Sequence, residues 1–360
     1  MNNVKRIQQQ LQERNLDALL ITGEKNQRYA LGFPFTDGAV VVSRDSAWLI
    51  TDSRYIEAAE NAAGSFANVV MFDGSKGLFA HIKDIVADNK ISSLGAEEEG
   101  LSHAEFIRYE KELGMELKGA QDILKTLRAA KTEEEISAMR QAQAISEAAL
   151  EETLPYIRPG VSEREIAAEL VYRMLRHGAE GNSFDPIVIT GKKTSMPHGV
   201  PGDELVAEGD FVTMDFGCLK HGYCSDMTRT VAVGHATDEM KNIYSTVLKA
   251  QLAGIAVARA GIPGYEIDKA ARDVITEAGY GEYFGHGFGH SLGLDIHEWP
   301  NANPRGKDIM PVGAVVSAEP GIYLPGKFGV RIEDVMILRE NGAEVITKAP
   351  KNELIILNNK

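Results

Sequence analysis

Two strand-like stretches, residues 211–233 and 315–338, carry acidic residues where a buried strand would carry apolar ones. In the first, F-V-T-M-D-F-G holds Asp215, and the apolar pattern that resumes after L-K-H-G holds Asp226. In the second, V-V-S-A-E-P-G holds Glu319 and V-R-I-E-D holds Glu333. A buried carboxylate without a partner costs free energy, so any fold of this chain must neutralise these four acids.

Each stretch predicts a β-hairpin. Gly222 supplies the turn of the first hairpin, and the Gly-rich segment 324–329 supplies the turn of the second. Two acids on one side of a hairpin raise each other's pKa, because like charges repel at close range. Two hairpins with two carboxylates each therefore predict a shared divalent-metal site.

His290, in G-H-G-F-G-H, is the predicted fifth ligand. Four carboxylates carry about −4 and two divalent ions about +4, so the cluster is balanced only when it is loaded. Oxygen-rich ligation with a single imidazole favours Mn²⁺, with Zn²⁺, Co²⁺ and Fe²⁺ as alternatives.

Composition narrows the class of protein. The chain has 360 residues, 44% of them hydrophobic and 25% charged, as in a globular protein with room for two domains. Its net charge of −14 argues against nucleic acid or an anionic membrane as a partner. The sequence has no apolar run that could span a bilayer, and M-N-N-V-K-R-I-Q-Q-Q lacks a signal-peptide core, so we expect a cytoplasmic protein.

Two cysteines, Cys218 and Cys224, lie within the first acidic hairpin. They could ligate a metal or form a redox pair. Two thiols without companions are more often small core residues, which is the interpretation we favour.

Two domains are predicted, at residues 1–124 and 125–360. The first alternates strand-like runs (17–22, 39–42, 47–51, 69–72) with helix-like ones, which predicts an α/β domain with a largely parallel or mixed sheet. A basic connector is expected at 123–131. Thr132 and Glu135 then form a capping box for a long amphipathic helix.

The second domain contains an apparent internal repeat. Four identities share one offset of 101 residues: Gly160 with Gly261, Glu165 with Glu266, Ile166 with Ile267, and Gly178 with Gly279. Chance can produce short identities, but a constant offset favours duplication. Each copy predicts a helix that ends at a glycine and leads to one acidic hairpin, so that two halves face each other across a pseudo-twofold axis.

These motifs, in this order over residues 130–350, resemble the pita-bread metallopeptidase family M24. The resemblance is to its Xaa-Pro branch, which comprises Xaa-Pro dipeptidase (prolidase) and aminopeptidase P. The first domain resembles, more weakly, the creatinase/prolidase N-terminal domain. The resemblance implies an α/β N-terminal domain followed by an α+β pita-bread catalytic domain with a pseudo-twofold repeat.

The resemblance also implies a role for each ligand. Asp215 would chelate one metal ion, Asp226 and Glu333 would bridge two ions, and His290 and Glu319 would hold the second. All five positions carry the residue type of the family.

Four further residues match positions of the family around the substrate. His198, in M-P-H-G, would lie on the substrate side, and His297, in D-I-H-E, would bond the reacting carbonyl or the leaving group. His286 would lie at the rim of the metal loop, and Arg331 would support the bridging glutamate or the substrate. Glu319 is the candidate to carry a proton from water to the leaving nitrogen, because it would sit beside the nucleophile.

The implied activity is hydrolysis of the bond between an N-terminal residue and proline in short peptides, by a homodimer. Two alternatives are a methionine aminopeptidase-like enzyme and a non-catalytic binding protein of the same fold. The first is disfavoured by the additional α/β domain and the second by the complete ligand set. Creatinase, which uses the scaffold without metals, should lack the acids. Dipeptidase and aminopeptidase P remain equal alternatives.

Overall fold

The computed structural model describes residues 2–358 of the chain. They form two compact units that divide between Arg128 and Ala129. The boundary expected after residue 124 falls inside helix α6 (Gln121–Ala129), so the basic segment at 123–131 is helical for most of its length. The reason is local: Ile123 and Leu124 are fully buried, and the residues that follow are good helix formers.

The N-terminal unit is built on one six-stranded sheet of order β4-β3-β2-β1-β5-β6. Strand β1 pairs antiparallel with β2 and parallel with β5, so the sheet is mixed. Its elements before α6 are α1 (Val4–Glu13), β1 (Ala18–Ile21), α2 (Glu24–Leu31), β2 (Gly38–Ser43), β3 (Ala47–Thr51), α3 (Ile56–Ala63), β4 (Asn68–Met71), α4 (Leu78–Asp88), β5 (Leu94–Ala96), α5 (His103–Leu113) and β6 (Leu117–Gly119).

The C-terminal unit begins with the predicted capping box, because the side chain of Thr132 accepts from the backbone of Glu135 and the Glu135 side chain bonds back. Its helices are α7 (Glu133–Thr153), α8 (Glu163–Arg176), α9 (Asp238–Val257) and α10 (Gly264–Glu277), with short 3₁₀ turns η1 (Leu154–Tyr156), η2 (Gly191–Ser195) and η3 (Gly281–Tyr283). Its strands are β7 (Gly181–Asn182), β8 (Ile187–Thr190), β9 (Phe211–Phe216), β10 (Cys218–Lys220), β11 (Tyr223–Cys224), β12 (Met227–Val233), β13 (Gly289–Ser291), β14 (Glu298–Ala302), β15 (Val315–Ala318), β16 (Gly321–Leu324), β17 (Phe328–Arg331), β18 (Asp334–Arg339), β19 (Gly342–Val345) and β20 (Ile356–Leu357).

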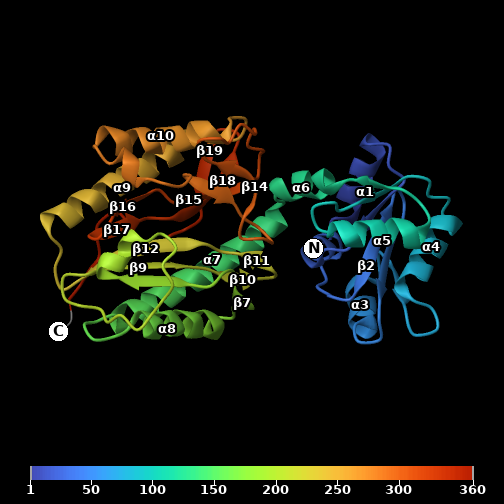
Figure 1. The fold of residues 1–360 in the computed structure, drawn as a ribbon, viewed down its shortest axis with the longest axis horizontal. Helices are drawn as coiled ribbons and strands as arrows, with labels where there is room; N and C mark the ends of the chain where they lie inside the picture. The colour runs from blue at the N-terminus through green and yellow to red at the C-terminus, as the bar shows by residue number, and fades with distance from the viewer. Residues whose placement is uncertain (1, 359–360) are drawn as a thin grey trace. The chain divides into compact units, whose positions relative to one another are not determined.

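Two main sheets organise this unit, a four-stranded one of order β20-β12-β9-β8 and a five-stranded one of order β14-β13-β15-β18-β19. The strands lie between the helix pair α9 and α10 and the helix pair α7 and α8 (Figure 1). Each half has its own cluster of buried apolar side chains. The curved sheets therefore line the middle of the unit and the helices cover its outside.

The internal repeat is visible in the backbone. Gly160 and Gly261 adopt φ of 89° and 83°, and Gly178 and Gly279 adopt 92° and 87°. These left-handed conformations favour glycine, which explains why these positions repeat. Each half also has an isolated β-bridge at a helix start, Ser162 to Leu205 and Pro263 to Ile309. The two halves therefore repeat one helix-to-sheet arrangement.

Both acidic stretches are interrupted hairpins, where we expected continuous ones. Strand β9 pairs with β12, with Asp215 opposite Thr228, but between them β10 and β11 form a separate hairpin in another sheet. In the second stretch β15 pairs with β18, and β16 with β17 makes its own two-stranded sheet. Asp226 and Glu333 therefore lie at equivalent positions, just before β12 and β18.

The interruption at Gly217 follows from a close approach of two backbones. A Cβ atom at this glycine would lie 1.9 Å from the carbonyl oxygen of Ser225. Nearby Cys218 and Cys224 are both buried, as expected for small core residues. Among residues 2–358, no helix combines the length and the apolar character needed to cross a membrane.

Candidate metal centre

Asp226 and Glu333 directly precede strands β12 and β18, Glu319 directly follows β15, and Asp215 lies near the end of β9. All four acids are shielded from solvent. Glu333 is 1% exposed, Asp226 3% and Asp215 9%, and the side chain of Glu319 is 17% exposed. The backbone N–H of Glu333 donates to the carbonyl of Thr228, 3.1 Å away, which ties the second half to strand β12 of the first. The acidic break in each half thus meets the other half.

His290 lies among these acids on β13. Its Nε2 is 3.3 Å from Oε1 of Glu319 and 3.5 Å from Oδ2 of Asp226. The backbone N–H of His290 donates to Ser317 Oγ, which in turn donates to Glu319 Oε1, each over 3.0 Å. Ligand atoms of Asp226, His290 and Glu333 all lie within 4.8 Å of one another, the spacing at which three side chains can share an ion.

Arg331 is the buried cation of the site. Its Nη2 donates to Asp215 Oδ2 over 2.5 Å, and its Nε donates over 3.0 Å to the hydroxyl of Thr228. That hydroxyl donates over 2.7 Å to Glu333 Oε2. Arg331 therefore contacts one acid directly and reaches the bridging candidate Glu333 through a threonine.

Tyr323 joins Arg331 to His286. The phenol oxygen lies 2.9 Å from Arg331 Nη1 and 2.9 Å from His286 Nε2, while His286 Nδ1 lies 2.9 Å from the carbonyl of Gly287. Arg331 Nη1 also donates to the carbonyl of Pro197, over 3.3 Å, directly before His198. One guanidinium thus connects an acid, a tyrosine and the loop that carries His198.

Burial sets the protonation of the site. Burial raises the pKa of Asp226 and of Glu333 well above the ordinary range, and repulsion from neighbouring carboxylates adds to both shifts. Burial also raises the pKa of Glu319. Burial lowers the pKa of His286, His290 and His297, so that their imidazoles are neutral at neutral pH.

This arrangement fits divalent cations. Oδ1 of Asp215 is buried and accepts no hydrogen bond from residues 2–358, which leaves a carboxylate oxygen available as a ligand. Burial and then repulsion between neighbouring carboxylates raise the pKa of Asp226 and Glu333, and a bound cation would offset both effects. Carboxylate oxygens with one neutral imidazole form the donor set of Mn²⁺ and similar ions.

The acids and histidines line one cleft of about 440 Å³. It holds every residue that the sequence predicted for the site: His198, Asp215, Asp226, His286, His290, His297, Glu319, Arg331 and Glu333. The rings of His290 and His297 meet edge to face with centroids 4.3 Å apart. The remaining wall is partly apolar, from Phe184, Ile187 and Ile296.

Sequence reasoning missed two polar residues of this network, Thr228 and Tyr323. Asp226, Thr228 and Thr230 alternate along one strand, and this period of two could have placed Thr228 on the side of the acid. Tyr323 had no such signal, because its hydroxyl stands alone in an apolar strand, G-I-Y-L.

Both units match known protein families. Residues 137–340 match the family described as "Metallopeptidase family M24", and residues 3–130 match the family described as "Creatinase/Prolidase N-terminal domain". The chain is 42% identical, over 95% of its length and 96% of the relative's, to "Uncharacterized peptidase YqhT" of Bacillus subtilis.

Solved structures match over almost the whole chain. "Xaa-Pro dipeptidase from Bacillus anthracis" is 42% identical with a TM-score of 0.94, covering 99% of each chain. "X-Pro aminopeptidase from Thermotoga maritima" is 39% identical with a TM-score of 0.91, covering 99% of this chain and 100% of that one. The chain therefore belongs to metallopeptidase family M24, with a creatinase/prolidase N-terminal domain ahead of a pita-bread catalytic domain.

Proposed function

We propose that this chain is a dinuclear-metal peptidase that hydrolyses the bond between an N-terminal residue and proline. The observation that carries the proposal is the gathering of four shielded carboxylates and His290 in one cleft, with two of the acids at strongly raised pKa. The names of its structural relatives, an Xaa-Pro dipeptidase and an X-Pro aminopeptidase, support the substrate class.

The proposed ligand set is the one that the family resemblance implies, and the close grouping of Asp226, His290 and Glu333 supports it. Asp215 would hold one ion, His290 and Glu319 the other, and Asp226 and Glu333 both. When bound, divalent ions supply an activated water at neutral pH and polarise the scissile carbonyl. Mn²⁺ is the ion we propose, because oxygen donors dominate the set.

The proton carrier in this proposal is Glu319. Burial raises the pKa of its carboxyl group, so the group accepts a proton more readily than an exposed glutamate does. The hydroxyl of Ser317 donates to Oε1 of Glu319 and holds that oxygen in place. From there Glu319 would pass the proton to the leaving proline nitrogen.

The oxyanion donor in this proposal is His297. Burial lowers its pKa, so its imidazole is neutral near pH 7 and can donate one N–H to the developing negative charge. His198 lines the same cleft and would lie on the substrate side. His286 and Arg331 act through Tyr323 and Asp215, and we assign them a positioning role.

Proline is recognised by shape in this proposal, because its amide has no N–H to donate. The apolar part of the wall, formed by Phe184, Ile187 and Ile296, is suited to a compact ring.

The test is a product assay with Mn²⁺-loaded protein, using Ala-Pro, a longer Ala-Pro-Yaa peptide and Ala-Ala. We expect free alanine from one or both proline peptides and far less from Ala-Ala. Release from Ala-Pro alone identifies a dipeptidase, and release from the longer peptide identifies an aminopeptidase P. Absence of release from every proline peptide, or equal cleavage of Ala-Ala, contradicts the proposal.

Two finer proposals come from the sequence and from the family resemblance. We expect a homodimer, which sedimentation analysis would measure, and a cytoplasmic location, which cell fractionation would measure. A monomer at micromolar concentration would overturn the first, and recovery outside the cytoplasm would overturn the second.

A further inference from the structure

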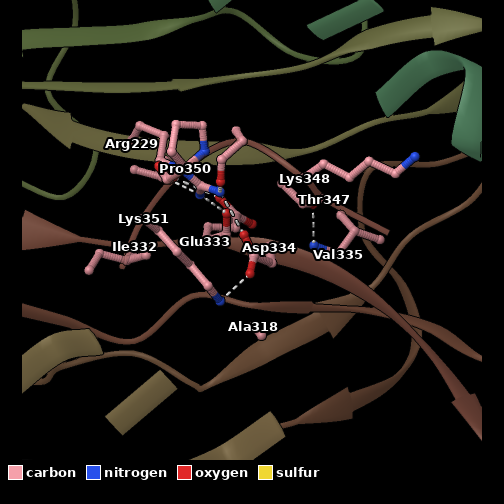
Figure 2. Close-up of polar contacts among 12 residues, drawn as sticks. Arg229, Ala318, Ile332, Glu333, Asp334, Val335, Thr347, Lys348, Pro350 and Lys351 are labelled. Carbon is pink, nitrogen blue, oxygen red and sulfur yellow. Dashed lines mark hydrogen bonds and ion pairs between the residues drawn. The ribbon is translucent and has the colours of Figure 1, made fainter. Parts of the chain in front are cut away.

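A buried polar cluster lies directly behind the two metal-site glutamates. It consists of Arg229, Gln251, Asp334 and Lys351. Arg229 is 1% exposed, Gln251 and Asp334 are fully buried, and the side chain of Lys351 is 14% exposed. Figure 2 shows Lys351 reaching Asp334 beneath the segment that carries Glu333. Two cations and one anion leave this cluster with one positive charge beside an acidic site.

Gln251, on α9, connects the two glutamates. Its Nε2 donates over 2.9 Å to the carbonyl of Ala318 and over 3.2 Å to the carbonyl of Ile332, the residues immediately before Glu319 and Glu333. A peptide unit is planar, so a fixed carbonyl also fixes the N–H and the Cα of the next residue. A single side-chain amide therefore sets the peptide planes that lead into both glutamates.

Lys351 fixes the orientation of the Gln251 side-chain amide. Its ammonium donates over 2.5 Å to Oε1 of Gln251 and also contacts Asp334. An ammonium only donates and a backbone carbonyl only accepts, so one orientation of the Gln251 amide satisfies all three contacts. Without the ammonium, Oε1 would be buried with no donor from Lys351, and the amide would lose part of its hold on the two strands.

Arg229 secures the same backbone from the other side. Its Nη1 donates over 2.6 Å to the carbonyl of Glu333, and its Nη2 donates over 2.8 Å to Oδ1 of Asp334. Nη2 also donates over 2.7 Å to the carbonyl of Ala349, the residue before Pro350. The C-terminal segment 347–351 is thus bonded to the peptide that bears Glu333.

We propose that Gln251 and Lys351 are positioning residues that hold Glu319 and Glu333 at the separation needed to bind metal. Lys351 lies beyond residues 137–340, the part of the chain that matches the M24 family. Neither residue is among those that line the substrate cleft. The inference rests on the proposed metal centre, because it assigns a function to the spacing of two proposed ligands.

The test measures Mn²⁺ affinity and stoichiometry by calorimetry on chelator-stripped protein, well below its unfolding temperature. The variants are Lys351→Met, which removes the ammonium, and Gln251→Glu, which replaces the two N–H donors by an acceptor. We expect both to bind Mn²⁺ about 10-fold more weakly or worse, the range typical when a residue that orients a metal ligand is lost. At saturating Mn²⁺, KM for the peptide should equal that of the parent.

Lys348→Met is the matched control. Lys348 is an exposed lysine three positions from Lys351, and this variant should bind Mn²⁺ as the parent does. Parent affinity in both test variants, even with lower thermal stability, would reduce the cluster to a structural role and overturn the inference. If Gln251→Glu does not fold, Lys351→Met decides, since Lys351 lies nearer the surface. Failure of the parent itself to bind Mn²⁺ would instead contradict the proposed metal centre.

Discussion

At the scale of single residues, Asp226 and Glu333 are the acids of the site whose ionised forms are most strongly disfavoured. Both are buried, both face other acids, and the pKa of each is raised well above its ordinary value. Thr228 donates to Glu333 and Arg331 pairs with Asp215, but these contacts leave four acids facing one guanidinium among the described residues of the cleft. The site therefore favours the binding of protons or of metal cations.

The affinity for Mn²⁺ should increase with pH. A raised pKa means that Asp226 and Glu333 hold protons at a pH where ordinary carboxyl groups have lost them. An ion must displace those protons, so binding releases protons and weakens as the pH falls through the raised pKa values. Calorimetry in buffers of different ionisation enthalpy would measure the release. Proton-neutral binding with an affinity independent of pH would contradict this account.

His297→Gln should lower kcat by about 100-fold, the usual cost of losing one oxyanion donor. Because His297 is not a proposed ligand, the affinity of the variant for Mn²⁺ should match that of the parent. Steady-state kinetics at saturating Mn²⁺ and a metal titration separate the two effects. A loss of metal affinity would place His297 among the ligands instead.

At the scale of elements, the interrupted hairpins decide where the acids lie. Strands β9 and β12 separate at Gly217, where the chain crosses Ser225, and Asp226 follows directly. Residue patterns predicted both strand pairs and their turns. The interruptions were not predictable, because they depend on contacts between segments that the apolar periodicity does not report.

Gly217→Ala should destabilise the metal-free protein by about 1–3 kcal/mol or more, since an added methyl group would overlap the carbonyl of Ser225. Chemical denaturation measures the change in free energy of unfolding. Gly181→Ala is the control, because, apart from the glycine itself and its two chain neighbours, no atom of residues 2–358 lies within 4 Å of the Cβ position there. Equal stability of the two variants would show that the crossing of the two backbones is not a constraint.

At the scale of the whole molecule, the two units have separate buried clusters. A cluster in the N-terminal unit includes Leu20, Val41 and Ile82. In the described part of the C-terminal unit, residues 129–358, each half of the repeat has its own cluster. All five proposed ligands lie in the C-terminal unit. The sequence predicted the two halves of the C-terminal unit from two local signals. The acid-bearing motifs marked the site, and the repeat offset marked glycines that adopt a left-handed conformation.

Other features of the molecule could not be read from the sequence. The two compact units divide between Arg128 and Ala129, near the end of α6, and the sequence pattern did not show that this helix continues through most of the basic segment. The cluster of Gln251 and Lys351 joins residues 100 positions apart. Such a contact leaves no mark in a local pattern, and only a buried glutamine among the apolar residues of α9 hints at it.

Residues 129–360 expressed alone should fold and bind Mn²⁺ with the affinity of the full chain, because the core clusters and the proposed ligands of this unit are its own. Circular dichroism and calorimetry would check folding and binding. An unfolded product, or one with markedly weaker binding, would show that the N-terminal unit is required for the site.

The central claim is that five side chains hold a pair of ions on which peptide hydrolysis depends. The most direct measurement follows Ala-Pro and Ala-Pro-Yaa hydrolysis together with metal content, on one sample, before chelation, after it and after Mn²⁺ is restored, beside Asp226→Asn and His290→Ala. We predict two ions per chain, loss of activity on chelation, recovery with Mn²⁺, and no recovery in either variant. Full activity in the metal-free parent would contradict the account.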